Sequence, residues 1–122
     1  MELGDKTPAL FLSMIKYEFD QSDGRQKSGI YGILIGNRTY IGSTKRNIWV
    51  RIKEHERLLI KNKHYNKNIQ SAFNKVQDIV FFVIEYCEPE NVCRREQYFI
   101  DRWEPSMNIV RKVANYNRWK LH

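Results

Sequence analysis

An acidic side chain interrupts the apolar stripe of the last helix that the sequence predicts. At about 100° per residue, Glu96 lies about 40° from Val92, among positions that otherwise carry apolar side chains. The apolar members of this stripe are Val92, Phe99, Ile100 and Trp103. An ionised carboxylate at such a place is costly unless it has a partner. That partner is either a core cation or tyrosine hydroxyl, or a hard divalent ion, which binds one or two protein carboxylates.

A basic pair interrupts an earlier apolar stripe in the same way. The spacing predicts a helix from Asn47, as its N-cap, to about Lys61, with Ile48 on the buried side. Arg51 and His55 fall one turn apart on the edge of this stripe. A guanidinium at the core boundary needs an anion, and a phosphate would serve. A histidine on an apolar face is otherwise a hydrogen-bonded core residue, so both interpretations stay open.

Two tyrosines lie in short β-rich runs that are bracketed by glycine. Tyr31 is in the run GIYGILI at residues 29–35, and Tyr40 is in the run TYIGST at residues 39–44. The Gly-Asn-Arg sequence between the runs favours a tight hairpin. Tyrosines in strands are ordinarily packing residues, but neighbouring glycines let a backbone or a substrate approach closely.

The remaining elements predict a small α/β (α+β) fold. A second helix is expected over residues 66–75, a central strand over residues 79–86, and a third helix between Pro89 and Pro105. The order β-β-α-α-β-α predicts a three-stranded mixed or antiparallel sheet flanked by helices. The run at residues 14–19 fits a strand as well as a helix and is left unassigned.

The charge distribution points to a polyanion as partner. The chain has 122 residues, enough for one domain, and a net charge of +7. Residues 29–75 carry ten basic and two acidic side chains, and residues 106–122 carry four basic and no acidic ones. Such surfaces attract nucleic acid, although a merely solvated basic surface has the same composition.

The sequence also predicts a cytoplasmic protein without membrane contact. No window approaches 18 consecutive apolar residues, and the first residues mix charges into a short apolar run, unlike a signal peptide. Cys87 and Cys93 lack the C-x-x-C spacing, so reduced thiols are expected.

Taken in order, these motifs resemble those of the GIY-YIG nuclease family. The matching positions are Gly29-Ile30-Tyr31, Tyr40-Ile41-Gly42, Arg51, His55, Glu96 and Asn108. Their order and separations fit over residues 29–114, and a series of this length is far more specific than a single tripeptide. Residues 40–45 and 70–75 are similar to the phage and intron homing endonucleases of the family.

The resemblance implies a metal-dependent DNA endonuclease. Glu96 would bind one Mg²⁺ or Mn²⁺ ion, and Arg51 would stabilise the phosphate. Tyr31 would be a general base or its relay, Tyr40 would orient water or phosphate, and His55 would act as base or proton shuttle. Because a phenol with a pKa near 10 is a poor base at neutral pH, we expect Tyr31 to position water and His55 to accept the proton.

The resemblance and the charge pattern also suggest substrate-binding residues. These are Lys45, Arg46, Asn108, Arg111 and Lys112, of which the last two lie in a basic tail. His64 occupies a position where some homing members also have a histidine, and it is expected at the surface.

We expect an N-terminal extension at residues 1–28, a catalytic domain at 29–110 and the basic tail at 111–122. Because homing enzymes take their specificity from a separate DNA-binding region, specificity here would come from a homodimer or from a separate domain or protein. The alternatives are a restriction-type or repair-type nuclease of the same family, a non-catalytic nucleic-acid-binding domain, and a small interaction module.

Overall fold

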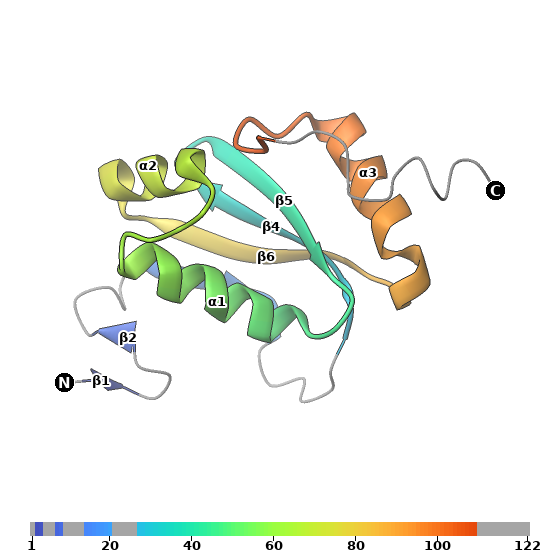
Figure 1. The fold of residues 1–122 in the computed structure, drawn as a ribbon, viewed down its shortest axis with the longest axis horizontal. Coiled ribbons are helices and arrows are strands. Elements are labelled where there is room, and N and C mark those ends of the chain that lie inside the picture. Colours follow the sequence, from blue (N-terminus) through green and yellow to red (C-terminus); the bar gives the residue numbers. More distant parts are fainter. Residues whose placement is uncertain (1, 4–6, 9–13, 21–26, 110–122) are drawn as a thin grey trace.

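A mixed sheet of four strands, in the order β3-β6-β4-β5, forms the centre of the protein in this computed structural model (Figure 1). The structure describes residues 2–3, 7–8, 14–20 and 27–109. The strands of the sheet are β3 (Ile15–Glu18), β4 (Gly29–Ile35), β5 (Arg38–Thr44) and β6 (Ile79–Tyr86). A separate two-stranded sheet pairs β1 (Glu2–Leu3) with β2 (Thr7–Pro8). β3 runs parallel to β6, whereas β4 is antiparallel to both β5 and β6.

The sheet has one strand more than the three that the sequence predicts. The additional strand, β3, comes from the segment that the sequence pattern leaves unassigned. Ile15 of β3 is buried and pairs with Ile79 of β6, far along the chain. The four residues alternate between apolar and polar, but the run is short, has no adjacent turn signal and pairs only with a distant segment, so its pattern fits a strand as well as a helix.

The predicted hairpin of β4 and β5 is confirmed, with β5 beginning one residue earlier than expected. Ile35 pairs with Arg38, which leaves a turn of two residues. Gly36 is the first of these and has a φ of 63°, a conformation that costs side chains other than glycine free energy. The hairpin therefore holds Tyr31 and Tyr40 in a fixed register.

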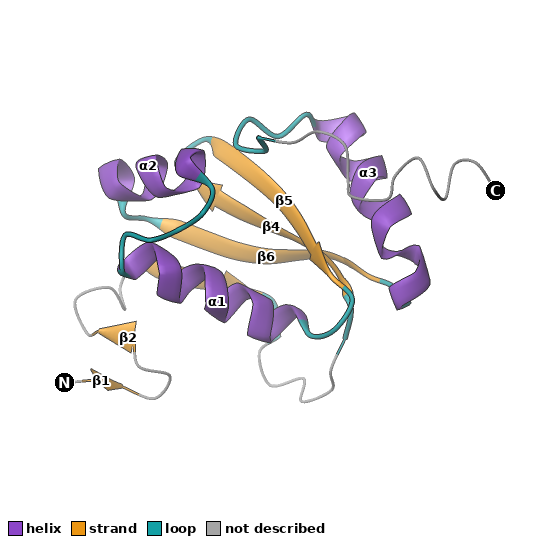
Figure 2. Ribbon diagram, in the orientation of Figure 1, coloured by secondary structure: helices purple, strands orange, loops and turns teal. Residues whose placement is uncertain are grey.

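The helices cover opposite faces of the sheet, because side chains along β4 alternate between two apolar clusters. Tyr31 and Ile33 pack in one cluster with residues of α1 (Ile48–Ile60) and α2 (Lys67–Val76). Ile30 packs in the other cluster with α3 (Val92–Trp103), which follows a 3₁₀ turn at Pro89–Asn91. Figure 2 shows α3 set apart from α1 and α2 around the sheet. None of the helices in the described ranges is long and apolar enough to cross a membrane.

The first two helices begin where asparagine side chains cap them. The Asn47 side chain accepts a hydrogen bond from the Val50 N–H at 3.3 Å, as the sequence predicts. The Asn66 side chain caps α2 by accepting from the N–H groups of Asn68 and Ile69. On α3 the buried stripe is rotated from the predicted one. Its buried members are Val92, Gln97 and Ile100, whereas Trp103, the last residue of the helix, is 49% exposed.

A buried polar network fastens β3 to α1. The Tyr17 hydroxyl donates to Oε1 of Glu56, whose side chain is almost fully buried. Lys53 Nζ donates to Oε2 of Glu56 at 2.5 Å and to the Tyr17 hydroxyl at 2.9 Å. The Glu56 charge is thereby paired and hydrogen-bonded, as a buried carboxylate requires. The network holds in place the helix that carries Arg51 and His55.

Candidate active site

Tyr31 occupies the middle of β4, with a fully buried side chain that lies over Gly42 of β5. A Cβ atom built at Gly42 would lie 2.6 Å from both Cζ and Oη of Tyr31. Cβ atoms do not approach other heavy atoms so closely, so only glycine leaves room for the phenol. The first glycine of the motif, Gly29, serves the sheet instead, because a Cβ there would collide with the backbone of β6.

A chain of hydrogen bonds leads from the Tyr31 hydroxyl into the protein. Tyr31 Oη lies 2.5 Å from His55 Nε2, and His55 Nδ1 lies 2.7 Å from His64 Nε2. The backbone N–H of Asn66 donates to His64 Nδ1 at 2.9 Å. Both histidines are buried, which corrects the expectation that His64 is a surface residue. His64 is held inside because the loop between α1 and α2 turns back over the sheet, where Gln70 accepts from its N–H.

The backbone N–H of Asn66, at the end of this series of hydrogen bonds, determines which group donates in each of them. An amide N–H can only donate, so His64 Nδ1 carries no proton and a neutral His64 carries its proton on Nε2. His55 Nδ1 must then accept, and His55 Nε2–H donates to Tyr31 Oη. Burial, followed by the Arg51 charge and His64, holds the pKa of His55 well below its usual value, which is consistent with a neutral ring. His55 is thus a donor to Tyr31, which differs from the proton-accepting role expected from the sequence.

The neutral histidine pair predicts acid sensitivity. Burial lowers the pKa of His64 to about 4, from 6.5 in an unfolded chain. Between these values the unfolded chain binds a proton that the folded protein does not, so stability is complete above about pH 6.5 and falls toward pH 4. The slope is at most about 1.4 kcal/mol per pH unit for each histidine. Urea unfolding at pH 7, 6 and 5 should show this fall, and His64→Gln should flatten it; equal slopes in both proteins would contradict the assignment.

Arg51 joins Tyr31 to a residue that the sequence did not single out. Its Nη2 donates to the Tyr65 hydroxyl at 2.7 Å, and its charge acts on the nearby Tyr31 hydroxyl. Burial, with the neighbouring Tyr40 next, raises the pKa of Tyr31 well above its usual value despite this guanidinium. Burial likewise raises the pKa of Tyr40, with contributions from Tyr65 and Glu96. Tyr31 and Tyr40 are therefore uncharged at neutral pH, and Arg51 is the cation beside them.

Glu96 lies near Arg51 and Tyr40, although it belongs to α3 on the other face of the sheet. β5 is the edge strand of the sheet, and Ser43 near its end donates to Glu96 Oε1 at 2.5 Å. Burial raises the pKa of Glu96, while the hydrogen bond from Ser43 and the charge of Arg51 oppose the shift. Within the described part of the chain, Ser43 is the hydrogen-bond partner of Glu96, and Oε2 has none. A partly buried carboxylate with one unengaged oxygen can take a cation.

Comparison with known proteins agrees with this arrangement. A family model described as the GIY-YIG catalytic domain matches residues 27–109. The chain belongs to the GIY-YIG family. A solved structure of the catalytic domain of the homing endonuclease I-TevI is 29% identical, covers 69% of this chain and 99% of its own, and has a TM-score of 0.60. A mutant of the catalytic domain of intron endonuclease I-TevI is 27% identical over 71% and 97%, with a TM-score of 0.64. The curated proteins contain no match.

The structure thus has the GIY-YIG nuclease fold, and it places the other residues singled out from the sequence in different surroundings. Asn108 is buried and uses its amide on β5, where Oδ1 accepts from the Ile41 N–H and Nδ2 donates to the Ile41 carbonyl, both at 2.9 Å. These two hydrogen bonds hold β5 at Ile41, between Tyr40 and Gly42. Lys45 and Arg46 are exposed in the loop after β5. Arg111 and Lys112 lie outside the described residues, as does the predicted tail.

The residues of this GIY-YIG site fit a cation that is held by few protein ligands. Among the described residues, no cluster of three or more histidine, cysteine, aspartate or glutamate side chains could enclose a metal ion. Glu96 offers an unengaged carboxylate oxygen there, and Glu54 is a second carboxylate beside Arg51, with its Oε1 3.8 Å from Arg51 Nη1. Mg²⁺ is commonly bound by one or two carboxylates together with substrate phosphate and water, so the donor set suits Mg²⁺ or Mn²⁺ that enters with the substrate.

Two residues of the site, Tyr65 and Ser43, are missed by reasoning from the sequence, and a third, His64, is expected at the surface. His64 and Tyr65 lie in the loop between α1 and α2, and Ser43 follows Gly42 in the motif. The adjacent aromatic residues His64 and Tyr65 in a polar loop were a signal in the sequence. In the structure the stacked rings of His55, His64 and Tyr65 line this side of the site. For Ser43 there is no comparable signal, because serine is common at strand ends.

Proposed function

We propose that this GIY-YIG domain is a divalent-metal-dependent endonuclease that hydrolyses the phosphodiester bonds of DNA. The observation that carries the proposal is that Tyr31 of β4 lies over Gly42 while Glu96 of α3 accepts from the next residue, Ser43, and that the charge of Arg51 on α1 acts on both. The I-TevI catalytic domains, which share this fold, are named as parts of homing and intron endonucleases. The basic surface of the chain suits a polyanionic substrate.

In this proposal Arg51 binds the scissile phosphate. A guanidinium presents several N–H donors in one plane and stays charged at all relevant pH values. Its Nη2 donates to the Tyr65 hydroxyl, and its side chain is about one third exposed, so other donors can reach a phosphate. The charge is therefore held in place before substrate arrives, which is the condition for electrostatic stabilisation of a transition state.

Tyr31 orients the oxygen of the attacking water or of the phosphate and does not act as the general base. The Tyr31 oxygen accepts a hydrogen bond from His55 and lies near the Arg51 charge, which leaves its own hydrogen for the attacking water or the phosphate. The raised pKa of Tyr31 and the amide-fixed donor role of His55 argue against either as base at neutral pH. His64 acts through His55 as a positioning residue.

Glu96 would hold the divalent cation. When bound, such an ion neutralises phosphate charge and lowers the pKa of water. Ser43 keeps Oε1 of the carboxylate oriented, which leaves Oε2 for the cation. Because the carboxylate is partly buried, its interaction with a cation is screened less than it would be at the surface.

The test is a nicking assay on supercoiled plasmid. The purified chain should convert plasmid to nicked or linear DNA in Mg²⁺, should stop when a chelator is added, and should resume with excess Mg²⁺. The active-site variants described below, purified in the same way, control for contaminating nucleases. DNA binding without cutting, in Mg²⁺ and in Mn²⁺, would instead support a non-catalytic nucleic-acid-binding domain.

A further inference from the structure

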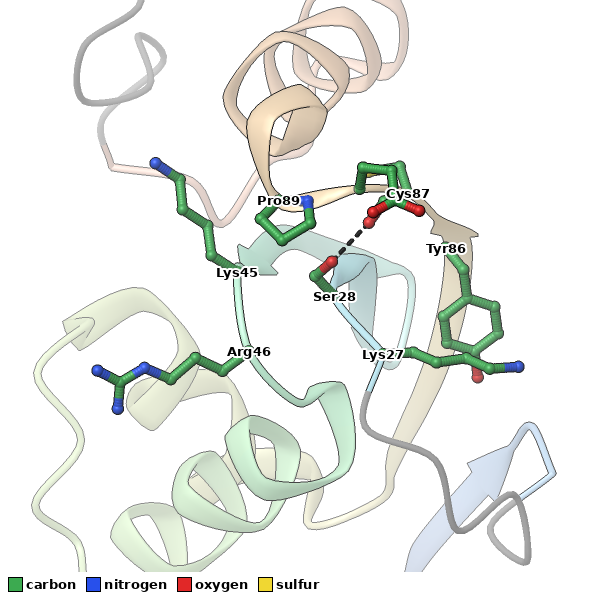
Figure 3. Close-up of a pocket in the computed structure, with 8 residues that line it drawn as sticks. Lys27, Ser28, Lys45, Arg46, Tyr86, Cys87 and Pro89 are labelled. Carbon is green, nitrogen blue, oxygen red and sulfur yellow. Dashed lines mark hydrogen bonds between the residues drawn. The ribbon is translucent and has the colours of Figure 1, made fainter.

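A basic hollow of about 610 Å³ opens at the end of the sheet, outside the group of residues around Tyr31 (Figure 3). Its walls come from the segment before β4, the loop after β5 and the segment that follows β6. The lining residues are Lys27, Ser28, Lys45, Arg46, Tyr86, Cys87, Glu88 and Pro89. Three of these side chains are cationic and one is acidic, so the hollow favours an anion.

The cations of the hollow stand on its rim. Figure 3 shows Lys45 and Arg46 on one side and Lys27 with Tyr86 on the other, with Ser28 between them. The floor is closed by the protein itself, because Ser28 Oγ donates to the Cys87 carbonyl at 2.6 Å. The Lys27 ammonium lies 4.7 Å from the centre of the half-exposed Tyr86 ring. A ligand would therefore meet positive charge along the edges of the hollow and few hydrogen-bond donors at its floor. This distribution suits an extended phosphate backbone.

Lys45 and Arg46 are available to such a ligand. Both side chains are exposed, and neither forms an ion pair within the described part of the chain. The loop that carries them is itself ordered by a hydrogen bond from the Arg46 N–H to the Thr44 hydroxyl at 3.2 Å. Their charges are thus presented from a defined backbone and are not engaged in ion pairs, while Glu88 is the acidic residue that lines the same hollow.

One wall of the hollow begins just after the end of β5, close in sequence to the active site. Ser43 contacts Glu96, and Lys45 follows two residues later, one residue beyond the strand. Two residues span at most about 7 Å, which is about the advance along a duplex axis of two nucleotides of one strand. A strand whose scissile phosphate lies at Arg51 and Glu96 would therefore bring a phosphate of its flank to the rim of the hollow.

We infer that the hollow binds the phosphate backbone of the DNA that flanks the cleaved bond, with Lys45 and Arg46 as its principal cations. The inference rests on the proposed function for the location of the cleaved bond. It assigns sequence-independent affinity to the hollow, because phosphate contacts position a protein on DNA without reading its bases. The chemistry of cleavage stays with the residues around Tyr31.

The experiment compares the salt dependence of DNA binding in two double variants. One is Lys45→Ala with Arg46→Ala, and the matched control is Arg57→Ala with Lys61→Ala, which removes the same charge from exposed positions at the other end of α1. Binding to a fluorescent 30-base-pair duplex is measured without metal, so cutting plays no part. Each lost phosphate contact lowers the slope of log K against log salt by about 0.9, so the hollow variant should lose about 1.8 and the control much less.

Two results would overturn the inference. One is an unchanged slope in the hollow variant, and the other is an equal change in the control variant. In cleavage assays with Mg²⁺, the hollow variant should raise KM by a larger factor than any fall in kcat. A chain that shows the slope difference but never cuts would refute the proposed nuclease and leave DNA binding by the hollow intact, so the two failures are distinguishable.

Discussion

Replacement of Glu96 by glutamine is expected to slow DNA cleavage by about 1000-fold and to stabilise the metal-free protein. Glutamine keeps the shape and can still accept a hydrogen bond from Ser43, but it removes the charge that would hold the cation. Loss of metal-based charge stabilisation amounts to several kcal/mol in the transition state, which corresponds to this factor. The measurement is the single-turnover rate of plasmid nicking at saturating DNA over a titration of Mg²⁺.

The expected gain in stability of Glu96→Gln distinguishes a metal-binding role of Glu96 from a structural role, for which the replacement would lower stability. Burial raises the pKa of Glu96, which means that its ionised form is disfavoured in the folded protein. At pH 7 the neutral glutamine removes this cost, so the midpoint of urea unfolding should rise while activity falls, as is common for functional charges. A variant that loses activity because it is less stable than the parent would contradict a metal-binding role for Glu96. Unchanged nicking would contradict it directly.

Replacement of Arg51 by alanine is expected to slow cleavage by 100-fold or more. The loss follows from removal of the cation beside the Tyr31 and Tyr65 hydroxyls, where the phosphate charge would develop. Removal of a single donor of this kind costs about 100- to 1000-fold in rate. The matched control is Arg57→Ala, since Arg57 is an exposed arginine of the same helix. Rates of the three proteins are compared at saturating DNA in Mg²⁺.

Arg51→Lys refines this result, because it keeps the charge but loses the planar set of donors. A lysine cannot hold two phenols and a phosphate in fixed directions, so we expect it to recover only part of the rate. Equal rates for Arg51→Ala and the parent would show that the guanidinium does not act in the reaction. A similar loss of rate in Arg51→Ala and Arg57→Ala would point to a general effect of charge removal on DNA binding.

The local sequence determined the elements that carry the site. Glycine at residue 36 and alternating β-rich runs define the hairpin, and asparagine at residue 47 begins α1, because turns and caps depend on a few adjacent residues. The helical period placed Arg51 and His55 one turn apart and put Glu96 on the inner side of α3. These features follow from bond geometry over short distances, so the sequence was sufficient for them.

Tertiary structure alone decided the partners of these residues. β3 pairs with a strand that is distant in sequence, and Ser43 meets Glu96 only because α3 packs at the edge strand β5. The donor role of His55 depends on one backbone amide in the following loop, that of Asn66, acting through His64. Hydrogen-bond direction and burial depend on atoms brought together by the fold, which is why residue types and spacing could name the groups of the site but not their protonation.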